Sequence, residues 1–146
     1  MVNEGVKVKF ESNLNDLDTF SSGLLQEVRD YRICLLKGDL GSGKTTLVKN
    51  LLVQLKSESE VSSPTFSIIN EYESVNGEVI YHMDLYRLKT PDEIFDLGFM
   101  EYLDSGSICF IEWPEQIENH IDSPYLEILI EHSLNENRSY YVTRHD

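Results

Sequence analysis

Apolar positions recur along the chain with two different spacings, and the two spacings alternate. Spacings of three and four residues predict one helix that begins with a cap at Ser12 or Asn13 and ends near Asp30, and a second helix that runs to Leu55. Alternating or continuous apolar positions predict strands at residues 6–10, 33–36, 78–83, 108–111, 126–130 and 139–142, and at the end of residues 62–72. Strands that alternate with helices are typical of an α/β fold, in which a mainly parallel central sheet lies between two helical layers.

Turn-forming residues divide this pattern further. Asn76-Gly77 is a two-residue hairpin signal, so an antiparallel hairpin is expected to be inserted into the parallel sheet. Thr90-Pro91-Asp92-Glu93 has the spacing of a capping box with proline at the first helical position, which predicts a short helix. A further helical turn is expected over residues 98–103. Polar segments at residues 56–60 and 135–137 are expected to form a solvated loop and a turn.

Composition limits the class of protein. A chain of 146 residues is expected to form a single domain, residues 1–146, that buries a core without disulfides or structural metals. Cys34 and Cys109 both lie inside apolar runs, which favours buried free thiols in a reducing compartment over a metal site. No apolar run approaches the roughly 20 residues that span a bilayer. We therefore expect a cytoplasmic protein with no membrane partner.

Charge argues against strong direct contact with nucleic acid. The chain has 26 acidic and 12 basic residues and a formal net charge of −14, so its overall field repels a phosphate backbone. A single nucleotide remains compatible with this charge, because a local loop supplies hydrogen-bond donors and a bound cation supplies positive charge.

One segment of the sequence predicts such a loop. Gly38, Gly43, Lys44 and Thr45 fit the pattern G-x-x-x-x-G-K-[ST], with an apolar strand before it and a helix after it. The glycines let the backbone approach phosphates closely, and the helix start directs unpaired N–H groups at them. Lys44 is expected to reach the β- and γ-phosphates, and Thr45 to place its hydroxyl on Mg²⁺. The expected phosphate-binding residues are Asp39, Leu40, Gly41, Ser42, Gly43, Lys44, Thr45 and Thr46.

Two acidic residues follow predicted strands and complete the candidate site. Asp84 follows the strand over residues 78–83, and Glu112 follows the strand over residues 108–111. Carboxyl ends of strands form the edge at which ligands bind in open α/β sheets. One acid would attend the Mg²⁺ ion while the other orients or deprotonates a water molecule. We expect Glu112 at the metal and Asp84 at the water or in the metal's outer shell, although the two roles are interchangeable at this level.

Four other side chains each admit two interpretations. Thr65, after Pro64, is either a sensor of the γ-phosphate or an ordinary turn residue. His82 is expected to be a packed or hydrogen-bonded residue in preference to a catalytic one. Arg87 is expected to be a surface residue in preference to one that stabilises the charge of the transition state. Trp113 belongs either to the core or to a lid. As the only tryptophan, it is expected to report nucleotide binding by fluorescence.

The nucleotide is expected to be ATP. Asn119-His120-Ile121-Asp122 approaches the Asn-Lys-x-Asp pattern with which guanine-specific proteins bind their base. Histidine replaces the lysine, however, and no apolar strand precedes the segment. We therefore interpret this match as chance.

Several blocks together resemble one known family, TsaE (YjeE). They are residues 38–46, Ser63-Pro64-Thr65-Phe66, His82-Met83-Asp84-Leu85-Tyr86-Arg87 and Ile111-Glu112-Trp113-Pro114-Glu115. A P-loop alone is unspecific, whereas its combination with the D-L-Y-R and E-W-P-E blocks in so short a chain is highly specific.

The resemblance implies a bacterial P-loop ATPase with Mg²⁺ and ATP/ADP as cofactors. Such a protein works with TsaB and TsaD proteins in the threonylcarbamoyl modification of adenosine in certain tRNAs, and contacts tRNA mainly through these partners. Its hydrolysis is weak alone and serves the turnover cycle, not the transfer chemistry. Carried onto this chain, residues 41–46 would bind phosphates, Thr45 and Glu112 would attend Mg²⁺, and Asp84 would be needed for hydrolysis. A monomer is expected for the chain alone.

Two other functions remain open at this point. A small-molecule kinase would share the loop and the acids, but Arg138 and Arg144 are too sparse and too late in the chain to suggest an arginine-rich lid. A nucleotide-gated binding module would bind the same ligand without useful turnover.

Overall fold

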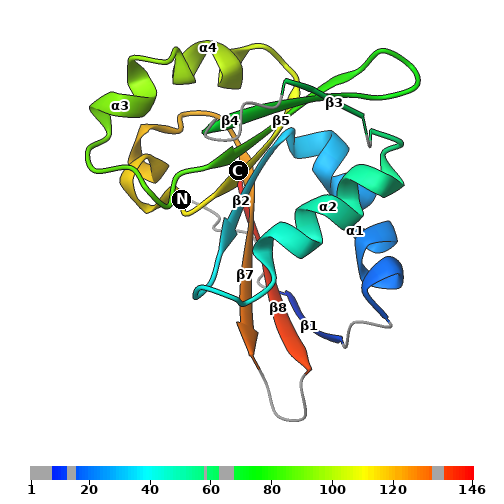
Figure 1. Ribbon diagram of the computed structural model, residues 1–146. Helices are drawn as coiled ribbons and strands as arrows, with labels where there is room; N and C mark the ends of the chain where they lie inside the picture. The colour runs from blue at the N-terminus through cyan, green and yellow to red at the C-terminus, as the bar shows by residue number, and fades with distance from the viewer. Residues whose placement is uncertain (1–7, 13–15, 58, 63–67, 133–136) are drawn as a thin grey trace.

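The chain forms one eight-stranded sheet with helices on both faces (Figure 1). The computed structural model describes residues 8–12, 16–57, 59–62, 68–132 and 137–146, with the backbone alone for residues 8–12 and 59–62. The strands are β1 (Val8–Ser12), β2 (Ile33–Lys37), β3 (Ser59–Ser62), β4 (Ile69–Glu73), β5 (Val79–Asp84), β6 (Ile108–Glu112), β7 (Tyr125–His132) and β8 (Arg138–His145). The helices are α1 (Leu17–Tyr31), α2 (Lys44–Gln54), α3 (Asp92–Phe95) and α4 (Phe99–Asp104), with the 3₁₀ turns η2 (Pro114–Gln116) and η3 (Glu118–His120).

The sheet has a parallel centre and antiparallel edges. The strand order is β1-β8-β7-β2-β6-β5-β4-β3. Within it β7, β2, β6 and β5 are parallel, whereas β8 and β1 at one end and β4 and β3 at the other run antiparallel to their neighbours. The parallel sheet and the hairpin at Asn76-Gly77, which joins β4 to β5, are thus confirmed.

Alternate residues of the central strands supply two separate cores. Cys34 and Leu36 of β2 belong to the core under α1 and α2, while Ile33 and Leu35 belong to the core under α3 and α4. Strands buried on both faces need continuous apolar runs, which explains why β2 and β6 lack the polar alternation of an exposed sheet. The three-layer arrangement predicted from the sequence follows directly from these two cores.

The two thiols lie on opposite sides of the sheet. Cys34 packs in the first core and Cys109 in the second, and both are buried and free. Burial raises the pKa of both thiols, that of Cys109 to about 12. They therefore behave as small apolar side chains, as the sequence predicts.

Short elements at the second face also match their sequence signals. Glu93 accepts hydrogen bonds from the backbone N–H of Lys89 and Thr90, which is the glutamate half of the predicted capping box. Gly98 precedes α4 with φ +85°, a left-handed conformation that favours glycine.

Several predicted boundaries were wrong. Ser12 ends β1 and is not a helix cap, because α1 starts at Leu17 after Asp16. Asn13, the alternative cap, lies outside the described residues. Ser59 and Glu60 belong to β3 and not to a solvated loop, since their backbone pairs with β4. Polar residues can form an edge strand because backbone hydrogen bonds do not depend on side-chain polarity.

No described helix combines the length and the apolar character needed to cross a membrane.

A pair of substitutions within α2 tests the first core. Leu51 is fully buried and Val53 is 52% exposed in the same helix. We expect Leu51→Ala to lower the free energy of unfolding by about 2–5 kcal/mol, because it removes buried methyl groups and leaves a cavity. Val53→Ala should change it by less than about 0.5 kcal/mol. Urea unfolding measures both values, and equal losses for the two variants would contradict this packing.

Candidate functional site

The loop between β2 and α2 lies at the carboxyl edge of the parallel strands. Residues 38–43 connect Lys37, the last residue of β2, to Lys44, the first residue of α2. Since β5 and β6 are parallel to β2, their last residues, Asp84 and Glu112, emerge at the same edge. The topology therefore brings three segments that are distant in sequence to one place.

Glycine is required at two positions of this loop. A Cβ on Gly38 would lie 2.6 Å from the carbonyl oxygen of Ile130, too close for any side chain. Gly43 has φ +109°, a left-handed conformation at the residue before α2. The loop backbone consequently wraps tightly against β7 and leaves the N-terminal turn of α2 open.

Lys44 is buried beneath the loop. The residue is 4% exposed, and its Nζ atom donates hydrogen bonds to the carbonyl oxygens of Gly38 (2.6 Å) and Asp39 (2.9 Å). Nζ also lies 4.0 Å from the ring centre of Trp113, a favourable contact between a cation and an aromatic face. Burial lowers the pKa of Lys44, and the negative charge of Glu112 opposes that shift.

Trp113 reaches Lys44 through an unusual backbone conformation. Its φ is +57°, in the left-handed region that bulky residues rarely adopt. The ring also contacts Tyr86, with ring centres 4.9 Å apart. Strained backbone of this kind is concentrated at functional sites, where the surrounding structure maintains it. Of the two interpretations made from the sequence, the structure places Trp113 at the wall of the site, with its ring half-buried.

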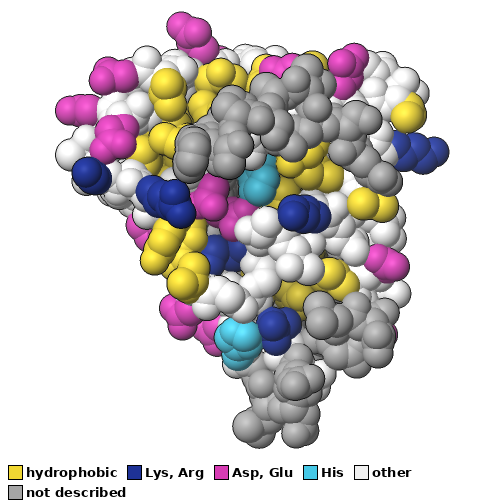
Figure 2. All heavy atoms as spheres, viewed as in Figure 1, with side chains coloured by type: hydrophobic (Ala, Val, Ile, Leu, Met, Phe, Trp, Pro, Cys, Tyr) yellow, Lys and Arg dark blue, Asp and Glu magenta, His cyan; other side chains and the backbone are white. Residues whose placement is uncertain are grey.

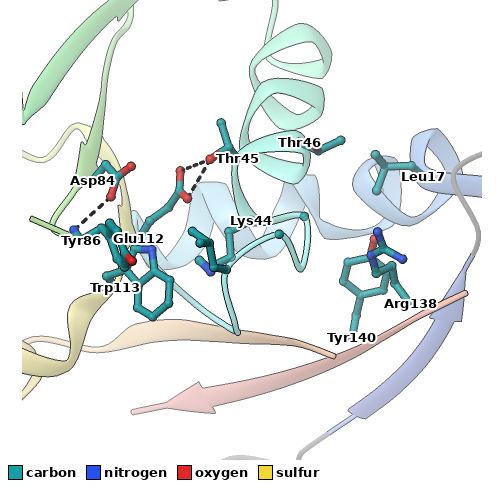
Figure 3. A pocket seen from close by; sticks show the side chains of 13 residues that line it. Leu17, Lys44, Thr45, Thr46, Asp84, Tyr86, Glu112, Trp113, Arg138 and Tyr140 are labelled. Atoms are coloured by element: carbon teal, nitrogen blue, oxygen red, sulfur yellow. Dashed lines mark hydrogen bonds between the residues drawn. The ribbon is translucent and has the colours of Figure 1, made fainter. Parts of the chain in front are cut away.

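Glu112 and Thr45 form the polar centre of the site. The Thr45 hydroxyl lies 2.9 and 3.0 Å from the two carboxylate oxygens of Glu112 (Figure 3). Glu112 is only 2% exposed, and His82 Nε2 lies 2.5 Å from its Oε2 atom. A buried carboxylate is tolerated when donors satisfy its oxygens, and both donors come from neighbouring elements.

Asp84 has a different environment from Glu112. It is exposed, and its Oδ1 atom accepts a hydrogen bond from the backbone N–H of Tyr86 at 3.1 Å. The two acids are register partners on β5 and β6. One carboxylate is therefore fixed in the protein, while its neighbour faces solvent at the pocket.

These residues surround a pocket of about 350 Å³. Its walls are formed by Leu17, Leu40, Gly41, Gly43, Lys44, Thr45, Thr46, Asp84, Tyr86, Glu112, Trp113, Arg138 and Tyr140. Figure 3 shows the acids and Trp113 at one end, Lys44 and Thr45 in the middle, and Leu17, Arg138 and Tyr140 at the other end. The pocket thus has an acidic end and an end that combines apolar side chains with one cation.

The structure brings together most of the residues predicted for the site, but not all. Asp39 and Ser42 line a second hollow of about 330 Å³ beside β7 and not the main pocket. Thr65 lies outside the described residues. Arg87 is exposed and does not line the pocket. Residues 119–122, which approached a guanine-binding pattern, lie in and after η3, away from the pocket.

Sequence reasoning named none of Leu17, Tyr86, Arg138 and Tyr140 as a residue of the site. Arg138 begins β8, and its Nε atom donates a hydrogen bond to the carbonyl oxygen of Ser42 at 2.8 Å. A strand order that places β8 beside β7 was needed to see this contact, because 96 residues separate the partners. Tyr86 could have been predicted as a site residue, since it lies two residues after Asp84 in the same sequence block.

Comparison with known proteins gives a consistent result. The sequence model of the family described as "Threonylcarbamoyl adenosine biosynthesis protein TsaE" matches residues 11–140. Proteins named tRNA threonylcarbamoyladenosine biosynthesis protein TsaE are similar over most of the chain. The one from Haemophilus influenzae is 42% identical over 95 residues, which cover 65% of this chain and 58% of that protein. The one from Bacillus subtilis is 40% identical over 113 residues, covering 76% and 68%.

A solved structure has the same fold. The crystal structure of Bacillus subtilis YdiB matches with a TM-score of 0.72 and 26% identity, covering 100% of this chain and 88% of that one. The chain spans less than two thirds of the length of several curated relatives, among them that of Rickettsia felis, which is 41% identical over 79% of this chain and 66% of its own length. The match to the family model over residues 11–140, together with relatives of this identity, shows that the chain belongs to the TsaE family of tRNA threonylcarbamoyladenosine biosynthesis proteins.

Proposed function

We propose that this chain binds Mg²⁺ and ATP at the loop over residues 38–46 and hydrolyses the nucleotide slowly. In this proposal it is the ATPase subunit of the system that makes N6-threonylcarbamoyladenosine in tRNA, and its hydrolysis serves the turnover cycle. One observation carries the proposal: Lys44, the Thr45–Glu112 pair and Asp84 line the same pocket. The relatives' names supply the pathway.

The two ends of the pocket suggest the direction in which ATP lies. Phosphates bind at the start of α2, where N–H groups and the helix dipole favour anions. The γ-phosphate would then point to the end with Asp84 and Glu112, where hydrolysis needs a cation and a water molecule. The base and ribose would lie towards Leu17, Arg138 and Tyr140, where apolar surface and a guanidinium group suit an aromatic base.

The side chains at the acidic end fit a magnesium ion. A threonine hydroxyl and a carboxylate are hard oxygen ligands, which Mg²⁺ prefers, and Thr45 and Glu112 already lie in contact. Mg²⁺ is usually held by one or two protein groups together with phosphate and water oxygens, so these two side chains would be sufficient protein ligands. Such an ion supplies positive charge to the phosphates during their transfer.

Burial supports different roles for the two acids. Glu112 is fixed by two donors and suits a metal site, which requires a carboxylate of defined orientation. Asp84 is exposed at the pocket and suits a residue that orients or deprotonates a water molecule. Both assignments agree with the expectation from the sequence.

The surface supports an indirect relation to tRNA. On the face shown in Figure 2, acidic side chains gather over the α3–α4 region, and the Lys and Arg side chains lie apart from one another. Because the net charge of −14 repels a phosphate backbone, we propose that the chain contacts tRNA mainly through TsaB–TsaD-type partner proteins in the cytoplasm. Leu40 and Tyr86 are 71% and 52% exposed at the pocket rim and offer apolar contacts to such partners. Alone, the chain is proposed to be monomeric.

Substitution of each acid tests the division of roles. We expect Asp84→Asn to reduce ATP turnover by about 100-fold or more while ATP affinity stays within about twofold, because the amide cannot accept a proton. Glu112→Gln should reduce turnover and also raise the Mg²⁺ concentration needed for half-maximal turnover. Turnover is measured by phosphate release and affinity by Trp113 fluorescence, since phosphates reach Lys44 beside that ring.

Asp104→Asn provides the matched control, because it removes the same charge from an exposed position at the end of α4. Its turnover should equal that of the unmodified protein. An Asp84→Asn variant with full turnover would contradict a role in hydrolysis. If that variant lacked turnover but supported tRNA modification in cells, the protein would be a nucleotide-gated binding module.

Partner dependence is tested by adding purified TsaB–TsaD-type proteins. We expect slow ATP turnover for the chain alone and an increase of at least about tenfold with the partner pair, as binding energy completes the site. Lys44→Ala, which lacks the phosphate-binding ammonium group, serves as the blank. An absence of stimulation with intact ATP binding would contradict the proposed place in the complex, and phosphate transfer to a small metabolite would indicate a kinase.

A further inference from the structure

His82 contacts Glu112 from inside the protein. It is 7% exposed on β5 and is not among the residues that line the pocket. In the β5–β6 register it lies opposite Phe110, one pleat before the pair formed by Asp84 and Glu112. Because residues two apart share a face of a sheet, His82 and Asp84 are directed to the same side, and His82 approaches the Glu112 side chain diagonally.

Hydrogen-bond accounting gives His82 a specific task. An ionised carboxylate only accepts hydrogen bonds, so His82 donates its Nε2–H to Oε2 at 2.5 Å. The Thr45 hydroxyl lies near both oxygens but carries one proton, so it serves one oxygen at a time. Among the described side chains, Thr45 and His82 are the two donors to this carboxylate. His82 therefore fixes Oε2 and leaves Oε1 facing Thr45.

We propose that His82 is a positioning residue that orients the Glu112 carboxylate for the magnesium ion. The inference rests on the proposed function, in which Thr45 and Glu112 attend that ion. The Thr45 oxygen would bind the cation through a lone pair and keep its single proton for one Glu112 oxygen, so His82 would be the donor that holds the other oxygen, Oε2. Groups that orient metal ligands in this way typically contribute 10- to 100-fold to metal affinity or activity. His82 itself touches neither nucleotide nor metal.

The experiment compares His82→Leu, which removes the donor, with His82→Gln, whose side-chain amide places an N–H near the position of Nε2. Two quantities are measured: the Mg²⁺ concentration for half-maximal ATP turnover, and ATP affinity from Trp113 fluorescence with EDTA and with Mg²⁺. We expect His82→Leu to raise the Mg²⁺ midpoint roughly tenfold, with ATP affinity in EDTA unchanged. His82→Gln should restore most of the loss. His82→Asn, whose amide is too short to reach Oε2, is the second removal variant should the leucine variant fail to fold.

His145→Leu is the matched control. His145 Nε2 lies 3.1 Å from Glu127 Oε1, so this variant also removes a contact between a histidine and a glutamate, but outside the pocket. Its Mg²⁺ midpoint should equal that of the unmodified protein. In a Glu112→Gln background, His82→Leu should have no further effect on the midpoint, because the group that it orients has been changed.

The outcomes separate the two proposals. Lys44→Ala and Glu112→Gln variants that behave like the unmodified protein would overturn the proposed function. If those two variants are defective, an unchanged Mg²⁺ midpoint in His82→Leu or His82→Asn would overturn the role of His82 alone. Equal defects in His82→Gln and His82→Leu, or additive effects of His82→Leu and Glu112→Gln, would likewise show that His82 acts through packing.

Discussion

A buried carboxylate at the carboxyl edge of the sheet is the constraint on which the rest of the site depends. Glu112 is 2% exposed and ends a strand whose five residues are all buried. Removing a carboxylate from water is costly unless donors replace the lost hydration. Thr45 at the start of α2 and His82 on β5 are those donors. The position of α2 against the sheet and the pairing of β5 with β6 are both needed to keep this carboxylate where it is.

The loop over residues 38–43 shows how the sheet positions the backbone as well. Gly38 passes so close to the carbonyl oxygen of Ile130 that a side chain would not fit, and Arg138 holds the carbonyl oxygen of Ser42. Both contacts come from β7 and β8, strands that follow the loop by about 90 residues. The loop over residues 38–43 is thus fixed from the C-terminal part of the sheet, while the acids come from its other side. Lys44 and Thr45 line one pocket with Asp84 and Glu112 because β2 lies between these two groups of strands.

Sequence reasoning located the parts of this site whose spacing is local. Lys44 and Thr45 follow from one contiguous motif, and the strand ends at Asp84 and Glu112 follow from apolar runs that terminate in an acid. The contact of Arg138 with Ser42 was out of reach, because it depends on the order of strands in space and not on any local pattern. The polar strand β3 was missed for a related reason. Its pairing with β4 uses backbone groups, which every sequence carries.

Environment, more than identity, distinguishes the two acids. Asp84 and Glu112 end neighbouring parallel strands in register, so their positions alone leave their roles interchangeable. Glu112 has exchanged water for two side-chain donors, whereas Asp84 is exposed and bonds to a backbone N–H of its own turn. A rigid carboxylate suits a metal ion of strict geometry, and an exposed carboxylate can adjust to a water molecule. The asymmetry originates at His82, which lies opposite Phe110 one pleat before the two acids. Its Nε2 atom contacts the Glu112 carboxylate, whereas the Asp84 carboxylate bonds to the backbone N–H of Tyr86.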